Sequence, residues 1–199
     1  MELKSCILAR TSSRSFETKN IPQETLIEIL DSARYAPSPK NRQPWRFLIL
    51  HGDGKRAIVE NYQSEKSRSH EFEYLMSGEY YSENNSFDII DQAPILILVF
   101  NAYPSKKTLP VYNLDFDMMN TQSIGAAVEH IMLRATDLGV SSLWLGDILS
   151  AEKFISASYP TMGKLTAGIV LGYSNAPCRK TDRLDFPEII FDYKEIQHG

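Results

Sequence analysis

The sequence predicts one domain in which a β-sheet carries helices on both faces. Apolar runs at residues 45–50, 94–100, 142–145 and 167–171 have the length of strands. Segments with helical spacing of apolar residues lie between them, and strand–helix–strand order of this kind places helices on both faces of a sheet. Because the 199-residue chain has no internal repeat or convincing boundary, residues 1–199 are expected to form a single domain with a sizeable core.

The first elements are helical. Residues 3–9 are predicted to form a short helix, and a second helix begins at Pro22, because proline suits the first helical turn. Leu26 and Ile29 follow helical spacing within it. The helix is expected to stop near Ala36, since the following proline restricts the residue before it.

The first strand is followed by Gly52-Asp53-Gly54, which we interpret as a plain turn before a helix at residues 55–62. Residues 63–92 are polar and rich in tyrosine, and we expect an irregular excursion with some helix. A loop this long inside a compact domain is often a lid or an interface element. Residues 104–110 are expected to form a further loop.

The second half contains the longest predicted helix, residues 114–138, which is apolar enough to be buried on most sides. Gly139 ends this helix. A short helix around residues 151–157 separates the last two strands. The tail is apolar from 186 to 193 although it is terminal, so it needs a surface to lie on, such as a partner subunit.

Composition argues against several classes of function. The formal net charge is -4 with a pI of about 5.6, whereas a nucleic-acid binder is usually basic. The longest clean apolar run, residues 95–100, is too short to span a bilayer, and the N-terminus lacks a signal-peptide core. We therefore expect a cytoplasmic protein that binds neither nucleic acid nor membrane. Cys6 and Cys178 do not resemble a disulfide framework.

The stretch Arg10-Thr11-Ser12-Ser13-Arg14-Ser15-Phe16 combines two arginines with four hydroxyl side chains. Guanidinium forks and hydroxyl donors are the groups that hold a phosphate. Arg10 and Arg14 are four residues apart, so on a helix they would share a face and converge on one anion. The alternative is a solvated helix end with surface ion pairs.

A second stretch, residues 36–45, is a proline-stiffened loop that carries Ser38, Asn41 and Gln43 and leads into the first strand. Amide side chains offer both donors and acceptors to a flat heterocycle. The alternative is a plain connecting loop with Trp45 in the core. Together the two stretches suggest a phosphorylated, aromatic cofactor.

No catalytic or metal-binding pattern accompanies these stretches. The sequence contains no HExxH motif, complete P-loop, G-x-G-x-x-G loop after a strand or G-x-S-x-G elbow. We therefore expect no metal ligands and no catalytic side chain. This combination is typical of proteins in which a cofactor carries the reaction.

Four segments resemble motifs of the nitroreductase family of FMN-dependent oxidoreductases. They are Arg10-x-Ser12-x-Arg14-x-Phe16, Ala36-Pro37-Ser38-x-x-Asn41-x-Gln43-Pro44-Trp45, residues 138–146 with the sequence LGVSSLWLG, and Leu171-Gly172-Tyr173 followed by Arg183 and Pro187-Glu188. They appear in the family's order and extend from residue 7 to about 191. The resemblance implies an α+β fold with a mixed sheet flanked by helices, built as an intimate homodimer with FMN at the dimer interface.

The resemblance also implies roles for particular residues. Arg10, Ser12 and Arg14 would hold the FMN phosphate and ribityl chain, with Arg183 and Lys180 as further phosphate contacts. Pro37, Ser38 and Pro39 would approach the flavin from the partner subunit with Asn41 nearby, and Leu145 and Gly146 would border the ring through backbone groups. The tail, residues 184–199, would wrap the other subunit.

The implied activity is a ping-pong transfer of hydride from transiently bound NAD(P)H, through tightly bound FMN, to nitroaromatic, quinone or similar small acceptors. Two alternatives stay open: an FMN enzyme with a dedicated metabolite substrate, such as a dehydrogenase or reductive dehalogenase, and a non-catalytic flavin-binding or storage protein. Substrate selection is expected from residues 63–92 and 102–113. Lys40 and Arg42 make the proline-stiffened loop more basic than the family pattern.

Overall fold

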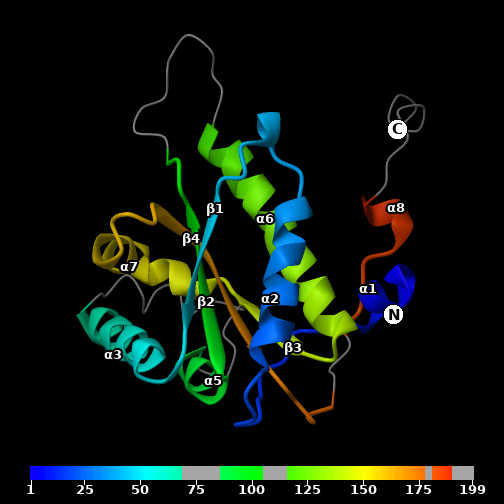
Figure 1. Cartoon of the computed structure of the whole chain (residues 1–199), viewed down its shortest axis with the longest axis horizontal. Coiled ribbons are helices and arrows are strands. Elements are labelled where there is room, and N and C mark those ends of the chain that lie inside the picture. The colour runs from blue at the N-terminus through cyan, green and yellow to red at the C-terminus, as the bar shows by residue number, and fades with distance from the viewer. Residues whose placement is uncertain (69–85, 105–115, 178–180, 190–199) are drawn as a thin grey trace.

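The structure is a computed structural model, and it describes residues 1–68, 86–104, 116–177 and 181–189. It has an α+β fold in which a four-stranded sheet lies between two layers of helices (Figure 1). The helices are α1 (Leu3–Ala9), α2 (Gln23–Asp31), α3 (Gly52–Arg68), α5 (Ser86–Gln92), α6 (Phe116–Asp137), α7 (Glu152–Ser158) and α8 (Phe186–Ile189). The strands are β1 (Trp45–Leu50), β2 (Ile95–Asn101), β3 (Ser141–Leu145) and β4 (Lys164–Gly172), and three short 3₁₀ helices are η1 (Ser32–Tyr35), η2 (Pro39–Asn41) and η3 (Asp147–Ala151).

The sheet has the order β1-β2-β4-β3, and each neighbouring pair of these strands is antiparallel. This corrects the expectation of a mixed sheet for the described strands. The parallel pairing among them is an isolated bridge between Ser12 and Ser142, which attaches the segment after α1 to the outer edge of β3. Strand β3 is therefore covered on its free side by the predicted phosphate-binding segment.

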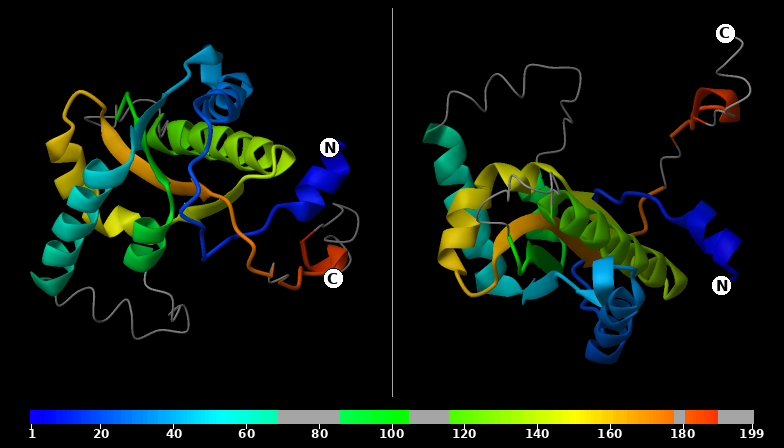
Figure 2. Two further views of the ribbon diagram at one scale, coloured as in Figure 1. Left: turned by 60° about the horizontal axis from the view of Figure 1, so that its bottom comes forward. Right: turned by 90° about the horizontal axis from the view of Figure 1, so that it is seen from above.

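Two hydrophobic clusters show that both faces of the sheet are covered, as the strand–helix–strand order predicts. On one face, α2 and α6 pack against alternate residues of β2, among them Ile95, Ile97 and Val99. On the other face, α3, α5 and α7 pack against Leu96, Leu98 and Phe100. All residues of β2 are buried because it is an interior strand with helices on both sides. Figure 2 shows the two layers from further directions.

The start of α3 differs from the prediction. Gly52-Asp53-Gly54 is the first turn of the helix rather than a separate turn, because Gly52 takes a positive φ of 43° and the carbonyl of His51 accepts hydrogen bonds from both Gly54 and Lys55. Helix α3 then extends into the predicted excursion at 63–92, and α5 occupies its end. Residues 69–85 lie outside the described residues, as does most of the predicted loop at 104–110.

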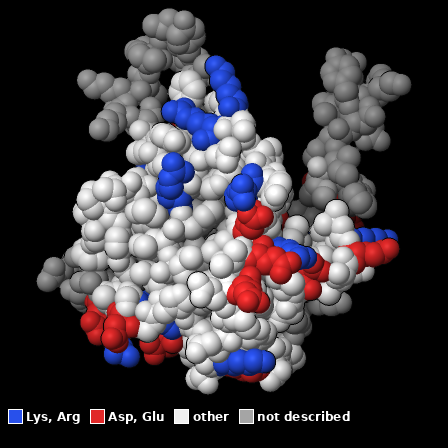
Figure 3. Space-filling model, viewed as in Figure 1, with Lys and Arg blue, Asp and Glu red and all other residues white. Residues whose placement is uncertain are grey.

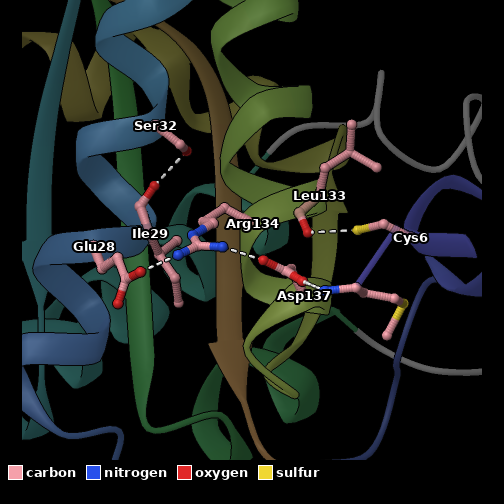
Figure 4. Close-up of polar contacts among 8 residues, drawn as sticks. Cys6, Glu28, Ile29, Ser32, Leu133, Arg134 and Asp137 are labelled. Atoms are coloured by element: carbon pink, nitrogen blue, oxygen red, sulfur yellow. Dashed lines mark hydrogen bonds and ion pairs between the residues drawn. The ribbon is translucent and has the colours of Figure 1, made fainter. Parts of the chain in front are cut away.

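The amino-terminal end of the chain is fixed to the carboxyl-terminal end of α6 (Figure 4). The terminal ammonium of Met1 pairs with Asp137, and Arg134 pairs with both Asp137 and Glu28 of α2. The buried thiol of Cys6 donates to the carbonyl oxygen of Leu133 at 3.0 Å. These contacts place α1 beside α6 and so set where the segment after α1 begins. Among the described residues, no helix combines the length and the apolar character needed to cross a membrane.

Candidate functional site

The predicted phosphate-binding segment follows the first helix, which ends where the sequence predicts, so Arg10 and Arg14 do not share a helix face. Helix α1 ends at Ala9, Arg10 has extended backbone angles, and Ser12 forms the bridge to Ser142. The backbone N–H of Ser13 donates to the carbonyl of Ser142 at 3.0 Å.

One of the two arginines of this segment has no ion-pair partner among the described residues. The Nε atom of Arg10 lies 3.8 Å from a carboxylate oxygen of Glu129 on α6, and the Arg10 side chain is only 19% exposed. Arg14 is exposed and makes no hydrogen bond or ion pair with any residue that the structure describes. Ser12 is also exposed. An exposed hydroxyl and an unpaired guanidinium two residues away can together hold an anionic oxygen.

Sequence reasoning missed Ser142, which lies directly beside this segment. Its side chain is 1% exposed, and its Oγ is the buried side-chain polar atom without a hydrogen-bond partner in the part of the chain that is described. Buried hydroxyls are nearly always hydrogen-bonded, so an unsatisfied one marks a place where a ligand or water belongs. The signal was present, since Ser142 falls within the quoted LGVSSLWLG segment.

The proline-stiffened loop has a strained backbone. Lys40, Asn41 and Gln43 all have positive φ angles, of 53°, 52° and 48°. Left-handed backbone at non-glycine residues costs about 1–3 kcal/mol each and clusters at ligand sites. The loop is held by its own polar groups: the Gln43 N–H donates to Ser38 Oγ at 3.0 Å, and the Gln43 amide donates to Asn41 Oδ1 at 3.1 Å. The loop is therefore more than a plain connection.

A surface depression of about 310 Å³ joins this loop to the amino-terminal half of α6. Its lining residues are Pro37, Ser38, Pro39, Met119, Gln122, Ser123 and Ala126. The structure thus brings together the three loop residues predicted to approach a flavin ring. Asn41 is exposed one 3₁₀ turn further along.

Leu145 ends β3, and Gly146 follows it before η3. Leu145 is buried in the core layer that contains α7, and a Cβ added to Gly146 would meet no atom within 4 Å. Open space therefore lies beside Gly146. A second surface depression, of about 330 Å³, is lined in part by Leu149, which follows Gly146 closely in the sequence. That depression is lined by Asn101, Asp117, Thr121, Leu149, Glu152, Lys164, Leu165 and Thr166.

Of the two remaining predicted phosphate contacts, Arg183 lies among the described residues. It donates to Thr181 Oγ1 at 2.7 Å within its own segment. Among the described residues, Arg183 makes no hydrogen bond or ion pair with Arg10 or Arg14. Lys180 lies outside the described residues.

The predicted site residues of one chain thus lie in two places along α6. The phosphate segment lies near Glu129, whereas Pro37, Ser38 and Pro39 lie near Met119. Within the described ranges, His, Cys, Asp and Glu side chains form no group of three able to hold a metal ion. The Cys6 thiol is unsuited to nucleophilic chemistry, because burial raises its pKa.

Comparisons with known proteins agree with this architecture. The sequence model described as the nitroreductase family matches residues 7–173. The chain is 26% identical over 185 residues to iodotyrosine deiodinase from Thermotoga neapolitana, covering 87% of this chain and 89% of that protein. It is 25% identical over 196 residues to 4-nitrobenzoate reductase from Nocardioides sp., covering 85% and 79%.

Solved structures show the same fold. One is a mutant of the FMN- and NADPH-dependent nitroreductase NfnB from Sphigopyxis sp. strain HMH, with a TM-score of 0.74 and 15% identity over 97% of this chain and 99% of that chain. At this identity the likeness concerns the fold alone.

Proposed function

We propose, from the premise that this chain belongs to the nitroreductase family, that it is an FMN-dependent oxidoreductase. In this proposal it transfers hydride from NAD(P)H to nitroaromatic, quinone or similar small acceptors. FMN, when bound, supplies the ring that accepts and passes on the hydride. The protein's own residues bind that ring, orient it and select what reaches it.

The observation that carries the proposal is a set of polar side chains at β3 that lack partners among the described residues. Arg14 has no carboxylate partner among the described residues, Ser12 is exposed, and the Ser142 hydroxyl is buried without a hydrogen bond. These groups suit a phosphate, because a phosphate offers oxygens to guanidinium and hydroxyl donors alike. Arg10 would contribute a second positive charge, shared with Glu129. A positive charge near the ring would also stabilise negative charge that develops there.

A homodimer would complete this site. The loop residues Pro37, Ser38 and Pro39 and the phosphate segment lie at different parts of α6 in one chain, so a second copy is the natural source of the loop. Gly146 would border the ring from the same chain as the phosphate segment, where open space lies beside it. This proposal predicts that the loop of each subunit serves the cofactor of the other.

Exposed apolar side chains support the same assembly. Leu3 and Leu8 on α1 are 70% and 67% exposed, Met118 on α6 is 58% exposed, and Trp144 on β3 is 41% exposed. Large exposed apolar residues mark association surfaces, and here they are spread along α6, from Met118 at its start to α1 beside its end. A second copy of the chain placed along α6 would cover them. Light scattering of the purified protein should give twice the 22.6 kDa mass of one chain.

The decisive test of the activity is the visible spectrum of the purified protein, followed by anaerobic addition of NADH or NADPH. Flavin absorption bands that bleach, and that return when a nitroaromatic or quinone is added, are the expected result. Bands that do not bleach with either donor would favour a storage role or another electron donor. A protein that shows no bands after incubation with FMN would overturn the proposal.

Reductive dehalogenation is the second candidate, because the chain is similar to an iodotyrosine deiodinase over most of both lengths. The same protein, reduced under anaerobic conditions, should be supplied with an iodinated phenol. Iodide release coupled to the return of the flavin bands would favour this alternative over nitroreduction.

A further inference from the structure

Two arginines of the proline-stiffened loop and its following strand converge on one tyrosine. The Arg42 guanidinium carbon lies 4.9 Å from the ring centre of Tyr103 and 5.9 Å from that of Phe116. The Arg46 guanidinium carbon lies 5.8 Å from the Tyr103 ring centre. A cation over an aromatic face within about 6 Å is attracted by the ring. Tyr103 and Phe116 remain 41% and 40% exposed, so the cluster is open to solvent.

The two guanidiniums have different tasks within the cluster. Arg46 donates to the carbonyl of Trp45 at 2.8 Å, and its second terminal nitrogen lies 3.5 Å from the Tyr103 hydroxyl. Arg46 therefore supports the tyrosine. The Arg42 guanidinium makes no hydrogen bond or ion pair with any described residue, so its N–H donors are available to a ligand.

The Arg42 guanidinium, like that of Arg14, has no carboxylate partner among the described residues, whereas some other exposed arginines do. Arg34 pairs with Asp31 at 2.6 Å, and Arg56 pairs with Asp53 at 3.2 Å. Figure 3 shows positive side chains gathered over the region of η2 and the start of β1, while carboxylates lie over the lower part of that face. The exposed Lys40 adds to the positive charge of this region.

The cluster borders the part of the chain predicted to approach the flavin. The backbone N–H of Arg42 donates to the carbonyl of Pro39 at 3.1 Å, so Arg42 lies one 3₁₀ turn from the residues that line the 310 Å³ depression. Phe116 begins α6, whose residue Met119 lines the same depression. A flat ligand held in the depression could therefore reach Arg42 with an anionic substituent.

We propose that Arg42, supported by Tyr103 and Arg46, binds an anionic oxygen group on a molecule that reacts at the flavin. This inference rests on the proposed function and specifies its substrate class. The group is a carboxylate of the acceptor or the 2′-phosphate of NADPH, since a guanidinium fork recognises both. The Tyr103 ring lies 4.9 Å from the guanidinium carbon and so restricts where Arg42 can place its N–H donors.

The test compares the parent protein with Arg42→Gln, using 4-nitrobenzoate and the neutral 4-nitrotoluene as acceptors. We expect the ratio of kcat/KM for 4-nitrobenzoate to that for 4-nitrotoluene to fall about 10- to 100-fold, mainly through KM, because a charge-assisted hydrogen bond is lost. The second arm compares KM for NADPH and NADH with 4-nitrotoluene as acceptor. Arg34→Gln is the matched control, since Arg34 is exposed but already paired with Asp31.

A fall confined to 4-nitrobenzoate identifies the acceptor as the source of the anion, and a rise confined to the KM for NADPH identifies the donor phosphate. If Arg42→Gln leaves both ratios as they are in the parent, the inference is overturned. A parent protein that reduces neither nitroaromatics nor quinones would instead overturn the proposed function, and the inference with it. If Arg42→Gln does not fold, the inference is tested with the parent protein alone. Its KM for the anionic ligand, but not for the neutral one, must then rise with ionic strength.

Discussion

The backbone N–H of Ser13 donates to the carbonyl oxygen of Ser142 at 3.0 Å, and this hydrogen bond fixes the candidate phosphate segment to the free edge of β3. The segment leaves α1 at Arg10 but takes its direction from the sheet. The position of Arg14 consequently depends on the attachment of this segment to the sheet. The phosphate-binding role of this segment can be tested one side chain at a time.

The first prediction is that Arg14→Ala weakens FMN binding. Charge-assisted contacts to a phosphate contribute about 1.5–3 kcal/mol, so the Kd for FMN should rise roughly 10- to 100-fold. Equilibrium titration of the apoprotein with FMN, followed by flavin fluorescence, measures this change. Arg56→Ala is the control, because Arg56 is an exposed arginine that pairs with Asp53 on α3. Equal Kd values for parent and Arg14→Ala would remove Arg14 from the cofactor site.

The helices and strands could be predicted from the sequence because their apolar spacing is local information. The start of α3 could not, since it depends on Gly52 taking a positive φ and on His51 accepting two hydrogen bonds. The antiparallel pairing of β3 with β4 also escaped prediction. Strand direction is decided by how the intervening helix crosses the sheet, and residue periodicity does not record that path.

The candidate site was predicted only in part for a related reason. Arg10 and Arg14 were identified by residue type, and the end of the helix at Ala9 agrees with the predicted helix at residues 3–9, but their spacing does not reveal that the following segment pairs with β3. Ser142 and Tyr103 are far along the chain from the residues they meet. Such contacts arise from the fold, so even the position of Ser142 within the LGVSSLWLG segment did not reveal which residues it meets.

The second prediction concerns Gly172, which lies close to Phe16, the last residue of the phosphate segment. A Cβ at Gly172 would lie 2.7 Å from Pro94 Cδ and 2.8 Å from Phe16 Cδ1, so Gly172→Ala must displace a buried ring. We expect the free energy of unfolding in urea to fall by about 1–3 kcal/mol. The affinity for FMN should fall with it. Gly125→Ala in α6 is the control, because its Cβ meets only Trp144 at an ordinary 3.7 Å, and alanine favours the helix by about 0.5–1 kcal/mol.

The third prediction concerns Lys55, whose buried ammonium joins α3 to the end of α5. Its Nζ donates to the carbonyls of Asp91, at 2.7 Å, and Ala93. Lys55→Met leaves the buried Ala93 carbonyl without this donor, and an unsatisfied buried carbonyl costs about 1–3 kcal/mol. Urea unfolding at pH 7 measures the loss. Lys153→Met on α7, where the lysine is exposed, should change the free energy of unfolding much less.

The pH dependence of the same pair of variants provides an independent check. Burial lowers the pKa of Lys55 below its ordinary value of 10.5, so the folded chain releases this proton at a lower pH than the unfolded chain. Between those two pKa values the unfolded state binds more protons, and the free energy of unfolding should rise with pH. Lys55→Met should lack that rise, whereas Lys153→Met should keep it.

The final prediction is that Asp137 stabilises the fold at neutral pH and ceases to do so in acid. The hydrogen bond from the Met1 ammonium, followed by the nearby charge of Arg134, holds the pKa of Asp137 below its ordinary value of 3.8. A carboxylate with a lowered folded pKa contributes stability that is present above 3.8 and is lost as the pH falls through the folded pKa. The difference in free energy of unfolding between the parent and Asp137→Asn should therefore be constant from pH 7 to about 5 and vanish near pH 2. Asp53→Asn, which removes a more exposed carboxylate on α3, should not produce this slope.

Because the Met1 pair fixes α1 to α6, Asp137→Asn should also speed amide hydrogen exchange in α1 at neutral pH. Unchanged exchange there would mean that the Cys6 contact alone holds α1 in place.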